Sequence, residues 1–403
     1  MSLTFVASST LANCTPTDGC INEANNTYVI VESNLPSLRV FNTSLVQQVS
    51  SSISASPIGV CMLNTASAVM VSTSVTTVDF IEIATGYSQT VSGGAHPVTT
   101  SSTSKGQYVA ADTSLGVAFA QGSGGNTVGQ VVKITASPQA VSLITLSTYD
   151  ENMISVILKQ PGQWLVSGQY GNIYQIDQFG NIQDFCAIRN LMNAGQYKNV
   201  TQAINPWNMS YDNNMLLVSS DCGIFLIDWS TKTLLKTIAA TPAGTTATPW
   251  LICQGSSGVT AAAYINGSQN GQQTVYEMDY TINPVSINSR LYLDSASNTV
   301  TTLALGASGY GFYLDSGARM RSFQCTPRGS TTRTVTVQES GVNENARLIV
   351  LNDTNGLGES YVVLDTMMTS PATYRVPTGQ TLMEIVKVGN GSTALFDVSR
   401  YST

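Results

Sequence analysis

The sequence lacks most of the residues that catalytic and metal sites are built from. His96 is the only histidine among 403 residues, so a histidine-dependent catalytic group has one possible member and a multi-histidine metal site is excluded. His96 stands beside Pro97 in a glycine-rich stretch, which favours a structural role in a turn. No glycine-rich phosphate-binding motif of the Walker or dinucleotide type occurs. We therefore expect no cofactor and no catalytic activity.

Charge is also scarce. Only 10% of the residues are charged, against a usual quarter, and the formal net charge is -7. The first 150 residues contain three basic and seven acidic side chains, so this half offers almost no field for polyanions and a nucleic-acid partner is not expected. No apolar run is long enough for a membrane-spanning helix, and Met1–Ala7 lacks the basic start of a signal peptide.

Cysteines are present in an odd number, seven, which argues against a disulfide framework. Cys14 and Cys20 are close enough in sequence to close a loop, although their spacing does not decide whether they do. Cys61, Cys222 and Cys253 lie within or beside apolar runs and are expected to behave as small apolar residues.

The chain does contain a short sequence pattern that recurs at a fixed interval. Ile176-Asp177, Ile227-Asp228 and Met278-Asp279 follow one another at intervals of 51 residues, and the same interval separates Ile83 from Ile134. A short β unit that recurs every 40 to 56 residues or so predicts a β-propeller, because one four-stranded blade cannot bury its faces without neighbours.

Further landmarks support this interpretation. A proline precedes an apolar strand at Pro57, Pro97, Pro206 and Pro249, and a second apolar strand follows about a dozen residues later. Seven such second strands are expected: Tyr28–Val31, Ala68–Val71, Tyr108–Ala111, Trp164–Val166, Leu216–Val218, Val259–Ala261 and Gly311–Leu314. The fold class predicted is therefore all-β, a seven-bladed β-propeller followed by a small β-sandwich or barrel domain.

Two families carry a resemblance to these repeats. The segment from Ile83 through Gly93-Gly94-Ala95-His96-Pro97 to Tyr108-Val109-Ala110 resembles the YVTN family of propeller repeats, in which a Tyr-Val-Ala-like triplet forms the second strand. Asp228-Trp229 resembles the Trp-Asp step of WD40 repeats in reversed order, but the Gly-His dipeptide of that family is missing. Both resemblances imply the propeller fold and neither implies a function.

The two ends of the chain have separate roles in this prediction. Leu3–Ala7 alternates like a strand and is expected to close the ring by pairing with the blade of residues 300–325. Residues 1–330 would form the propeller. After Arg328–Thr332, which reads as a linker, six further strands are expected between Arg333 and Val398, and they would form the small domain of residues 331–403.

One motif of this second domain has a recognisable pattern. Residues 372–382, with the pattern Tyr374-x-Val376-Pro377-x-Gly379-x-x-Leu382, look like a strand-turn-strand of accessory β domains in tailed-phage virion proteins. The resemblance covers some 20 residues. It implies a virion location and other virion proteins as partners.

Few residues qualify as a binding site. Arg319 and Arg321 would share one face of a strand, where they could bind a phosphate or carboxylate or could keep an exposed sheet edge soluble; the second reading is favoured. Trp207 and Trp250 follow equivalent prolines and could stack on a sugar, although a core position is favoured.

Acidic residues form the second group of candidates. Glu32, Asp112, Asp221 and Asp315 each end an expected second strand, so a ring of acids on one rim could bind a cation or act as an acid and base pair. Turn capping by aspartate explains these positions more simply. Asn352–Gly356 with Glu359 resembles a calcium loop only faintly, and a hairpin turn is favoured.

Three functional classes follow. The first is a non-enzymatic structural component of a tailed-phage virion, in a tail, fibre or capsid-decorating position, with the propeller displayed and the C-terminal domain used for attachment or homo-oligomerisation. The second is an extracellular, lectin-like propeller that binds a host glycan. The third is a propeller hydrolase, which requires converging carboxylates. The sequence favours the first.

Overall fold

The computed structural model is an all-β protein. The residues it describes are 2–92 except 12, 14, 54–56, 65, 73–76 and 86–87; 107–132 except 108, 113, 116 and 122–126; 142–146; 151–191; 204–240 except 213 and 221–222; 251–254; 260–265; 274–279; 286–292; 300–326 except 307 and 316; and 332–337, 346–352, 361–368, 372–377, 382–387 and 393–396. Within these ranges the one helix is the short α1 (Ile188–Leu191). No helix in this described part is long and apolar enough to cross a membrane.

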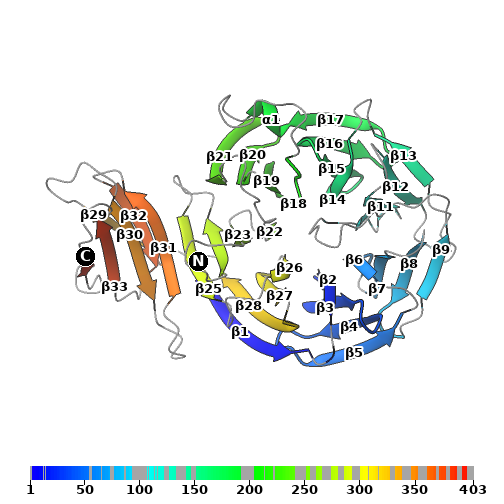
Figure 1. Cartoon of the computed structure of the whole chain (residues 1–403), viewed down its shortest axis with the longest axis horizontal. Helices are drawn as coiled ribbons and strands as arrows, with labels where there is room; N and C mark the ends of the chain where they lie inside the picture. The colour runs from blue at the N-terminus through cyan, green and yellow to red at the C-terminus, as the bar shows by residue number, and fades with distance from the viewer. Residues whose placement is uncertain are drawn as a thin grey trace.

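Most of the strands form four-stranded antiparallel sheets arranged in a ring, which is a propeller arrangement (Figure 1). Within each set of consecutive ring strands the strands pair in chain order. The first four sheets contain β2 (Pro16–Asn22), β3 (Thr27–Glu32), β4 (Ser37–Phe41) and β5 (Gln47–Ser52); β6 (Pro57–Met62), β7 (Ser67–Ser72), β8 (Thr77–Glu82) and β9 (Ser88–Ser92); β10 (Val109–Asp112), β11 (Val117–Gln121), β12 (Thr127–Val132) and β13 (Ser142–Thr145); and β14 (Met153–Gln160), β15 (Gln163–Gly168), β16 (Asn172–Asp177) and β17 (Ile182–Ala187).

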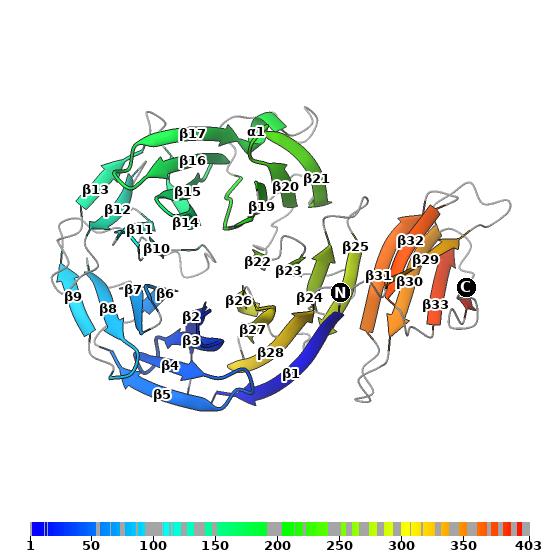
Figure 2. The same ribbon diagram turned by 180° about the vertical axis from the view of Figure 1, so that it is seen from behind.

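The other strands of the ring form two further sets of four and one set of three. The remaining strands are β18 (Asn208–Asp212), β19 (Met215–Ser220), β20 (Gly223–Asp228) and β21 (Thr233–Ala240); β22 (Leu251–Gln254), β23 (Thr260–Ile265), β24 (Thr274–Asp279) and β25 (Ser286–Tyr292); and β26 (Val300–Leu305), β27 (Tyr310–Asp315) and β28 (Arg319–Thr326). The strands labelled β26, β27, β2 and β3 lie near the centre of the ring, and β5, β9 and β17 lie at its outside (Figure 2).

The first strand of the chain completes the last sheet of the ring. β1 (Ser2–Thr10) pairs antiparallel with β28, from Ser2 opposite Thr326 to Thr10 opposite Arg319. The Leu11 amide extends this ladder by donating to the Ala318 carbonyl at 2.8 Å. The closing role expected for Leu3–Ala7 is therefore confirmed as a strand pairing.

The 51-residue interval has a structural cause. Asp177, Asp228 and Asp279 are the last residues of β16, β20 and β24, and each of these is the third strand of its four. The repeated Ile-Asp or Met-Asp step thus marks the point where the third strand turns into the fourth. Ile83 directly follows the third strand β8, whereas Ile134 lies outside the described residues.

One expected second strand is wrong. Residues 109–112 form β10, the first strand of its sheet, and the second strand is β11. The other six expected second strands coincide with β3, β7, β15, β19, β23 and β27. The Tyr-Val-Ala triplet does not form a second strand. β10 is as apolar as a second strand, and Val117-Ala118-Phe119 in the neighbouring β11 is equally apolar, so composition does not distinguish the two positions. The glycine-rich turn at 93–97 lies outside the described residues.

The core lies between neighbouring sheets, because each sheet is covered on both faces. β3 reads Thr-Tyr-Val-Ile-Val-Glu and all six of its residues are buried, as expected for a strand without a solvent face. One cluster joins two sheets by packing Ile157, Leu165 and Ile173 against Met209, Leu216 and Phe225. A similar cluster packs Phe119 against Trp164, whose ring centroids are 4.8 Å apart in an edge-to-face geometry.

The six strands expected after residue 330 are present. They are β29 (Thr332–Val337), β30 (Ala346–Asn352), β31 (Tyr361–Met368), β32 (Ala372–Pro377), β33 (Leu382–Lys387) and β34 (Thr393–Phe396). β29 pairs with β32, and β31-β30-β33-β34 continue the sheet of β22–β25 through a bridge between Ile287 and Asp365. These strands lie at the side of the ring next to β25 (Figure 1). Their assignment to a separate sandwich or barrel of residues 331–403 stays a prediction.

Candidate functional site

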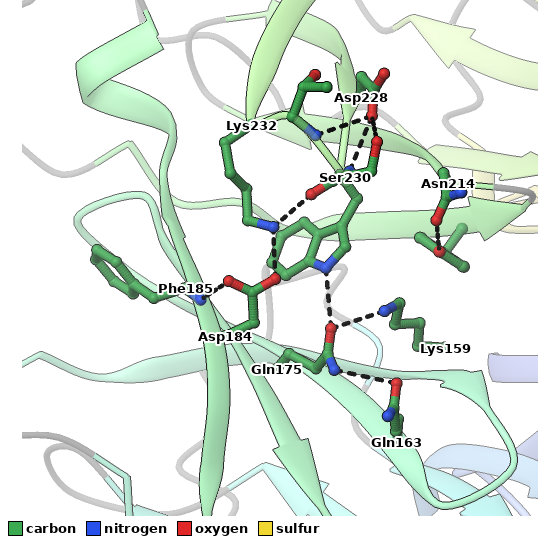
Figure 3. Close-up of polar contacts among 12 residues, drawn as sticks. Lys159, Gln163, Gln175, Asp184, Phe185, Asn214, Asp228, Ser230 and Lys232 are labelled. Carbon is green, nitrogen blue, oxygen red and sulfur yellow. Dashed lines mark hydrogen bonds and ion pairs between the residues drawn. The ribbon is translucent and has the colours of Figure 1, made fainter.

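The most extensive polar network of the described residues lies between two neighbouring sheets of the ring, β14–β17 and β18–β21. At its centre is Trp229, which follows the last residue of β20 and is only 2% exposed. Its indole Nε1 donates to Gln175 Oε1 of β16 at 2.9 Å, so the ring is anchored to the preceding sheet (Figure 3). We call this contact between the two sheets the Trp229 interface.

Gln175 is the hub of the network. The same Oε1 atom accepts a hydrogen bond from Lys159 Nζ at 2.7 Å, and Gln175 Nε2 donates to Gln163 Oε1 at 3.0 Å (Figure 3). Its side chain is buried, and both ends of its amide are used. Because a buried amide without partners is costly, these bonds fix the orientation of Gln175 and, through it, of Trp229.

Two lysines flank the indole. Lys232 Nζ lies 4.0 Å from the centroid of the Trp229 ring, forms an ion pair with Asp184 Oδ2 at 2.5 Å and donates to the Trp229 carbonyl. Lys159 Nζ lies 5.3 Å from the Tyr211 centroid and 6.0 Å from that of Trp229. Partial burial lowers the pKa of Lys159, and Lys232 lowers it further, while Asp184 opposes the change.

The aspartates at the turns have structural partners. Asp228 Oδ1 accepts hydrogen bonds from the Ser230 amide at 2.8 Å, the Ser230 hydroxyl at 2.6 Å and the Thr231 amide at 3.2 Å, and those from Ser230 lead in holding the pKa of Asp228 below its usual value. Asp177 Oδ1 likewise accepts from the amides of Phe179 and Asn181. These are side-chain caps of tight turns.

The candidate ring of acids resolves into three different arrangements. Asp315 caps its turn through the amides of Gly317 and Arg319, as turn chemistry predicts. Asp112 caps Ser114 and also accepts from the Gly162 amide of the next sheet at 2.6 Å. Burial raises the pKa of Asp112, but the hydrogen bonds from Ser114 and Gly162 outweigh this and keep it below its ordinary value.

The third arrangement is an ion pair. Glu32 is 1% exposed and lies 2.8 Å from Arg39 Nη2, and the Ser37 hydroxyl donates to the same carboxylate oxygen. Asp221 lies outside the described residues. One oxygen of Glu32, Oε1, thus has structural partners while its buried Oε2 has none, and turn capping explains the two aspartates.

A buried glutamate that the sequence did not single out is similarly bound. Glu151, which is 1% exposed, accepts hydrogen bonds from Asn172 Nδ2 at 2.7 Å, the Tyr170 amide at 3.1 Å and the Tyr174 hydroxyl. A Cβ added at Gly168 would lie 2.2 Å from its carboxyl carbon. Glycine at 168 therefore makes room for the carboxylate.

A second polar contact joins the first strands of two other sheets. Asp18 on β2 accepts a hydrogen bond from the Val60 amide of β6 at 3.0 Å, and Cys20 and Cys61 lie on the same two strands. Burial raises the pKa of Asp18 to about 7, despite the amides of Val60 and Gly19, and burial raises the pKa of Cys61 to about 12. We call this contact the Asp18 interface.

Neither interface is arranged as a metal site. In the part of the chain that the structure describes, no group of three or more histidine, cysteine, aspartate or glutamate side chains is placed to hold a metal ion. The loops at Asp221 and at Asn352–Gly356 lie partly or wholly outside that part. Cys14 also lies outside it, and Cys20 is a free thiol.

The predicted interaction residues fall in different sheets. Arg321 is 5% exposed and its guanidinium carbon lies 5.5 Å from the centroid of Phe5 on β1. Because β28 lies between β1 and β27, Arg319 and Arg321 are not on an edge strand, and the solubilising reading is wrong. Trp207 precedes β18 and is half-buried, and Trp250 lies outside the described residues.

Neither interface has a direct signal in the amino-acid sequence. Asp228-Trp229 marks one repeat and so points to Trp229, but its partner Gln175 lies 54 residues earlier. Asp18 and Val60 are 42 residues apart. Both pairs are separated by about one repeat, which is the signature of contacts between neighbouring sheets.

Comparison with known proteins identifies the fold alone. No protein-family model matches the sequence, and no curated protein sequence is significantly similar to it. A crystal structure of a catalytically inactive virginiamycin B lyase from Staphylococcus aureus with quinupristin is similar in shape, with a TM-score of 0.59 and 12% identity. The match covers 81% of this chain and 99% of the lyase. It supports the propeller arrangement.

Proposed function

We propose that this protein is a non-enzymatic structural component of a tailed-phage virion, in a tail, fibre or capsid-decorating position. In this proposal the ring has seven blades with YVTN-like repeats and is displayed outward. The C-terminal strands of residues 331–403 form an accessory domain that attaches the chain to other virion proteins or to further copies of itself.

The pairing of β25 with β31 is the observation that carries the proposal. The outermost strand of the ring sheet β22–β25 continues into β31, β30, β33 and β34, so the ring and the C-terminal strands share one hydrogen-bonded sheet. This bridge joins the displayed body to the attachment module through the main chain. That property suits a structural particle protein.

The carboxylates of the described residues also favour a structural role. A hydrolase needs two acids whose oxygens are free to receive and return a proton. In each of Asp112, Asp177, Asp228 and Asp315 at least one carboxylate oxygen instead holds turn amides. The similarity to the lyase, at 12% identity, transfers no activity to this chain.

Purified particles provide the test. A tagged full-length chain expressed during infection should co-purify with intact particles at a constant copy number, and gold labelling of the tag should mark one station. In contrast, a chain that stays outside the particles while the purified protein binds a glycan array, with binding lost in Trp207→Ala, would establish the lectin-like alternative. Turnover on glycoside, ester or peptide libraries would establish the enzymatic one.

A second experiment concerns the C-terminal strands. Light scattering of the full chain should give a defined oligomer, and residues 1–330 alone should give a monomer. Removal of the C-terminal strands uncovers the edge of β25, so a charged substitution on that strand, Ile287→Lys, belongs in the shortened chain to suppress edge pairing. If residues 1–330 assemble or dock as well as the full chain, the attachment role belongs to the ring.

A further inference from the structure

One glutamine ties together the first strands of three successive sheets. Gln107 directly precedes the sheet of β10, and its main-chain carbonyl accepts a hydrogen bond from the Val156 amide of β14 at 2.9 Å. Its side-chain oxygen Oε1 accepts from the Met209 amide of β18 at 3.0 Å and from the Ser155 hydroxyl of β14 at 3.2 Å. The two oxygens of this residue thus serve three donors on two other sheets.

The bond to Met209 passes over a whole sheet. The bonds that define the Trp229 interface and the Asp18 interface join adjacent sheets, and their partners are 54 and 42 residues apart. Gln107 and Met209 are 102 residues apart, and the sheet β14–β17 lies between their sheets in chain order and in the ring (Figure 1). Since a structural repeat normally contacts only its neighbours, this bond adds a coupling that the repeat architecture does not itself provide.

The donors lie on open sheet edges. β14 and β18 are the end strands of their sheets, and they lie on the inner side of the ring (Figure 1). The Val156 and Met209 amides donate to Gln107 and therefore point away from β15 and β19. No further strand of the same sheet covers such an edge, so its amides need acceptors from another part of the chain. Gln107 supplies these acceptors.

Burial makes these acceptors important. Ser155 and Val156 are each 1% exposed, and Met209 is fully buried. A buried donor that loses its acceptor costs more free energy than the bond contributes on average, because it was stripped of water on folding. Without the side chain of Gln107, the hydroxyl of Ser155 and the amide of Met209 would lose the oxygen that they share. The position of β18 therefore depends on a residue two sheets away.

We propose that Gln107 is a strap across the inner side of the ring, which makes β14 and β18 open together with the start of β10 rather than one sheet at a time. Its contacts all lie near the starts of first strands, so they share one end of the ring. At the other end, Asp112 holds the Gly162 amide of the adjacent sheet alone. The strap is a conformational device, and it does not depend on the virion assignment.

The test is hydrogen exchange of the full chain, followed by mass spectrometry of peptides that cover residues 153–160 and 208–212. In the unchanged chain both segments should exchange at one common slow rate. Gln107→Leu removes Oε1 but keeps the main-chain carbonyl for Val156, so residues 208–212 should exchange about tenfold faster while residues 153–160 stay slow. Gln107→Glu retains acceptor oxygens and should restore the common slow rate.

The matched control is Gln183→Leu, because Gln183 donates to Asp177 within a single sheet and its loss should leave both segments unchanged. Different rates for the two segments in the unchanged chain would overturn the proposal. So would a Gln107→Leu variant in which residues 208–212 stay slow, gain the exchange of one amide only, or accelerate equally with residues 153–160. If Gln107→Leu does not fold, Gln107→Asn, whose side chain is one methylene shorter, replaces it with the same expected results.

Discussion

The Trp229 interface and the Asp18 interface both join neighbouring sheets of one ring, but their buried polar groups differ in the hydrogen-bond and charge partners that they have. At the first, the indole and the ammonium of Lys159 share a single amide oxygen of Gln175. At the second, a carboxylate has the Val60 amide but no cation in ion-pair contact among the described residues.

The pKa values express this difference. At the first interface, burial lowers the pKa of Lys159 but the carboxylate of Asp184 opposes the change, whereas at the second burial raises the pKa of Asp18 to about 7 against only two backbone amides. A satisfied network stabilises the native state and leaves its charged groups charged, while an under-compensated carboxylate destabilises it at neutral pH. The comparison teaches that sheets of equal architecture differ in stability through a few side chains.

The largest expected effect is at Trp229. Trp229→Ala removes a 2% exposed side chain from the core cluster that joins two sheets, so the free energy of unfolding should fall by about 3–5 kcal/mol. Urea unfolding followed by circular dichroism measures it. Trp229→Phe keeps most of the packing but loses the N–H donor, so its free energy of unfolding should fall by only about 1–2 kcal/mol. Equal losses in the two variants would mean that the hydrogen bond, rather than packing, dominates the interface.

The next change removes the hub. Gln175→Leu leaves the Trp229 N–H and the Lys159 ammonium without their shared acceptor, so a loss of about 2–3 kcal/mol is expected. The control is Gln47→Leu, an exposed position on β5 of another sheet, which should change stability by less than about 0.5 kcal/mol. If the two substitutions change the free energy of unfolding equally, the hydrogen bonds of Gln175 contribute nothing to stability.

Removal of the charge at Asp18 should raise the free energy of unfolding, not lower it. Because the folded pKa of about 7 exceeds the ordinary 3.8, the native state holds the proton more tightly, and stability falls as pH rises from about 4 to about 7. Asp18→Asn keeps an oxygen for the Val60 amide and should be more stable than the unchanged chain at pH 8, by about 2 kcal/mol for this partly exposed side chain.

The pH dependence distinguishes charge from packing. The advantage of Asp18→Asn should be largest at pH 8 and smallest near pH 4, where the folded state holds the proton and the unfolded state has begun to take one up. Thermal melts at pH 4, 6 and 8 measure this trend. A variant that is less stable at pH 8, or equally stabilised at every pH, would show that Asp18 is not a buried carboxylate under strain, and the contrast between the interfaces would disappear.

The sequence predicted the ring better than either interface. The Ile-Asp repeat predicted the ends of the third strands correctly, since a turn aspartate is a local feature that each repeat needs for itself. Tyr108–Ala111 was misplaced because first and second strands are both buried and have the same apolar composition.

The candidate sites were harder to predict for a physical reason. Whether Arg321 is exposed depends on β1, which comes from the other end of the chain. The partners of Trp229 and Asp18 depend on the side chains of an adjacent sheet. Periodicity reports the repeat, but not which residue of one repeat meets which residue of the next.

The smallest expected effect is at Lys232. Lys232→Gln removes an ion pair with Asp184, whose side chain is 41% exposed, and a contact over the Trp229 ring. Exposed pairs and cation–π contacts of this kind contribute about 0.5–1 kcal/mol each or less, so the loss in unfolding free energy should be about 1 kcal/mol at low salt. The ion-pair part should vanish in 1 M NaCl, where the screening length is about 3 Å, whereas the ring contact is shielded by burial and should persist. A double-mutant cycle with Asp184→Asn, measured at both salt concentrations, separates the two parts. A coupling energy that does not respond to salt would mean that Lys232 stabilises the Trp229 interface by covering the indole with its aliphatic stem, and the charge would then be incidental.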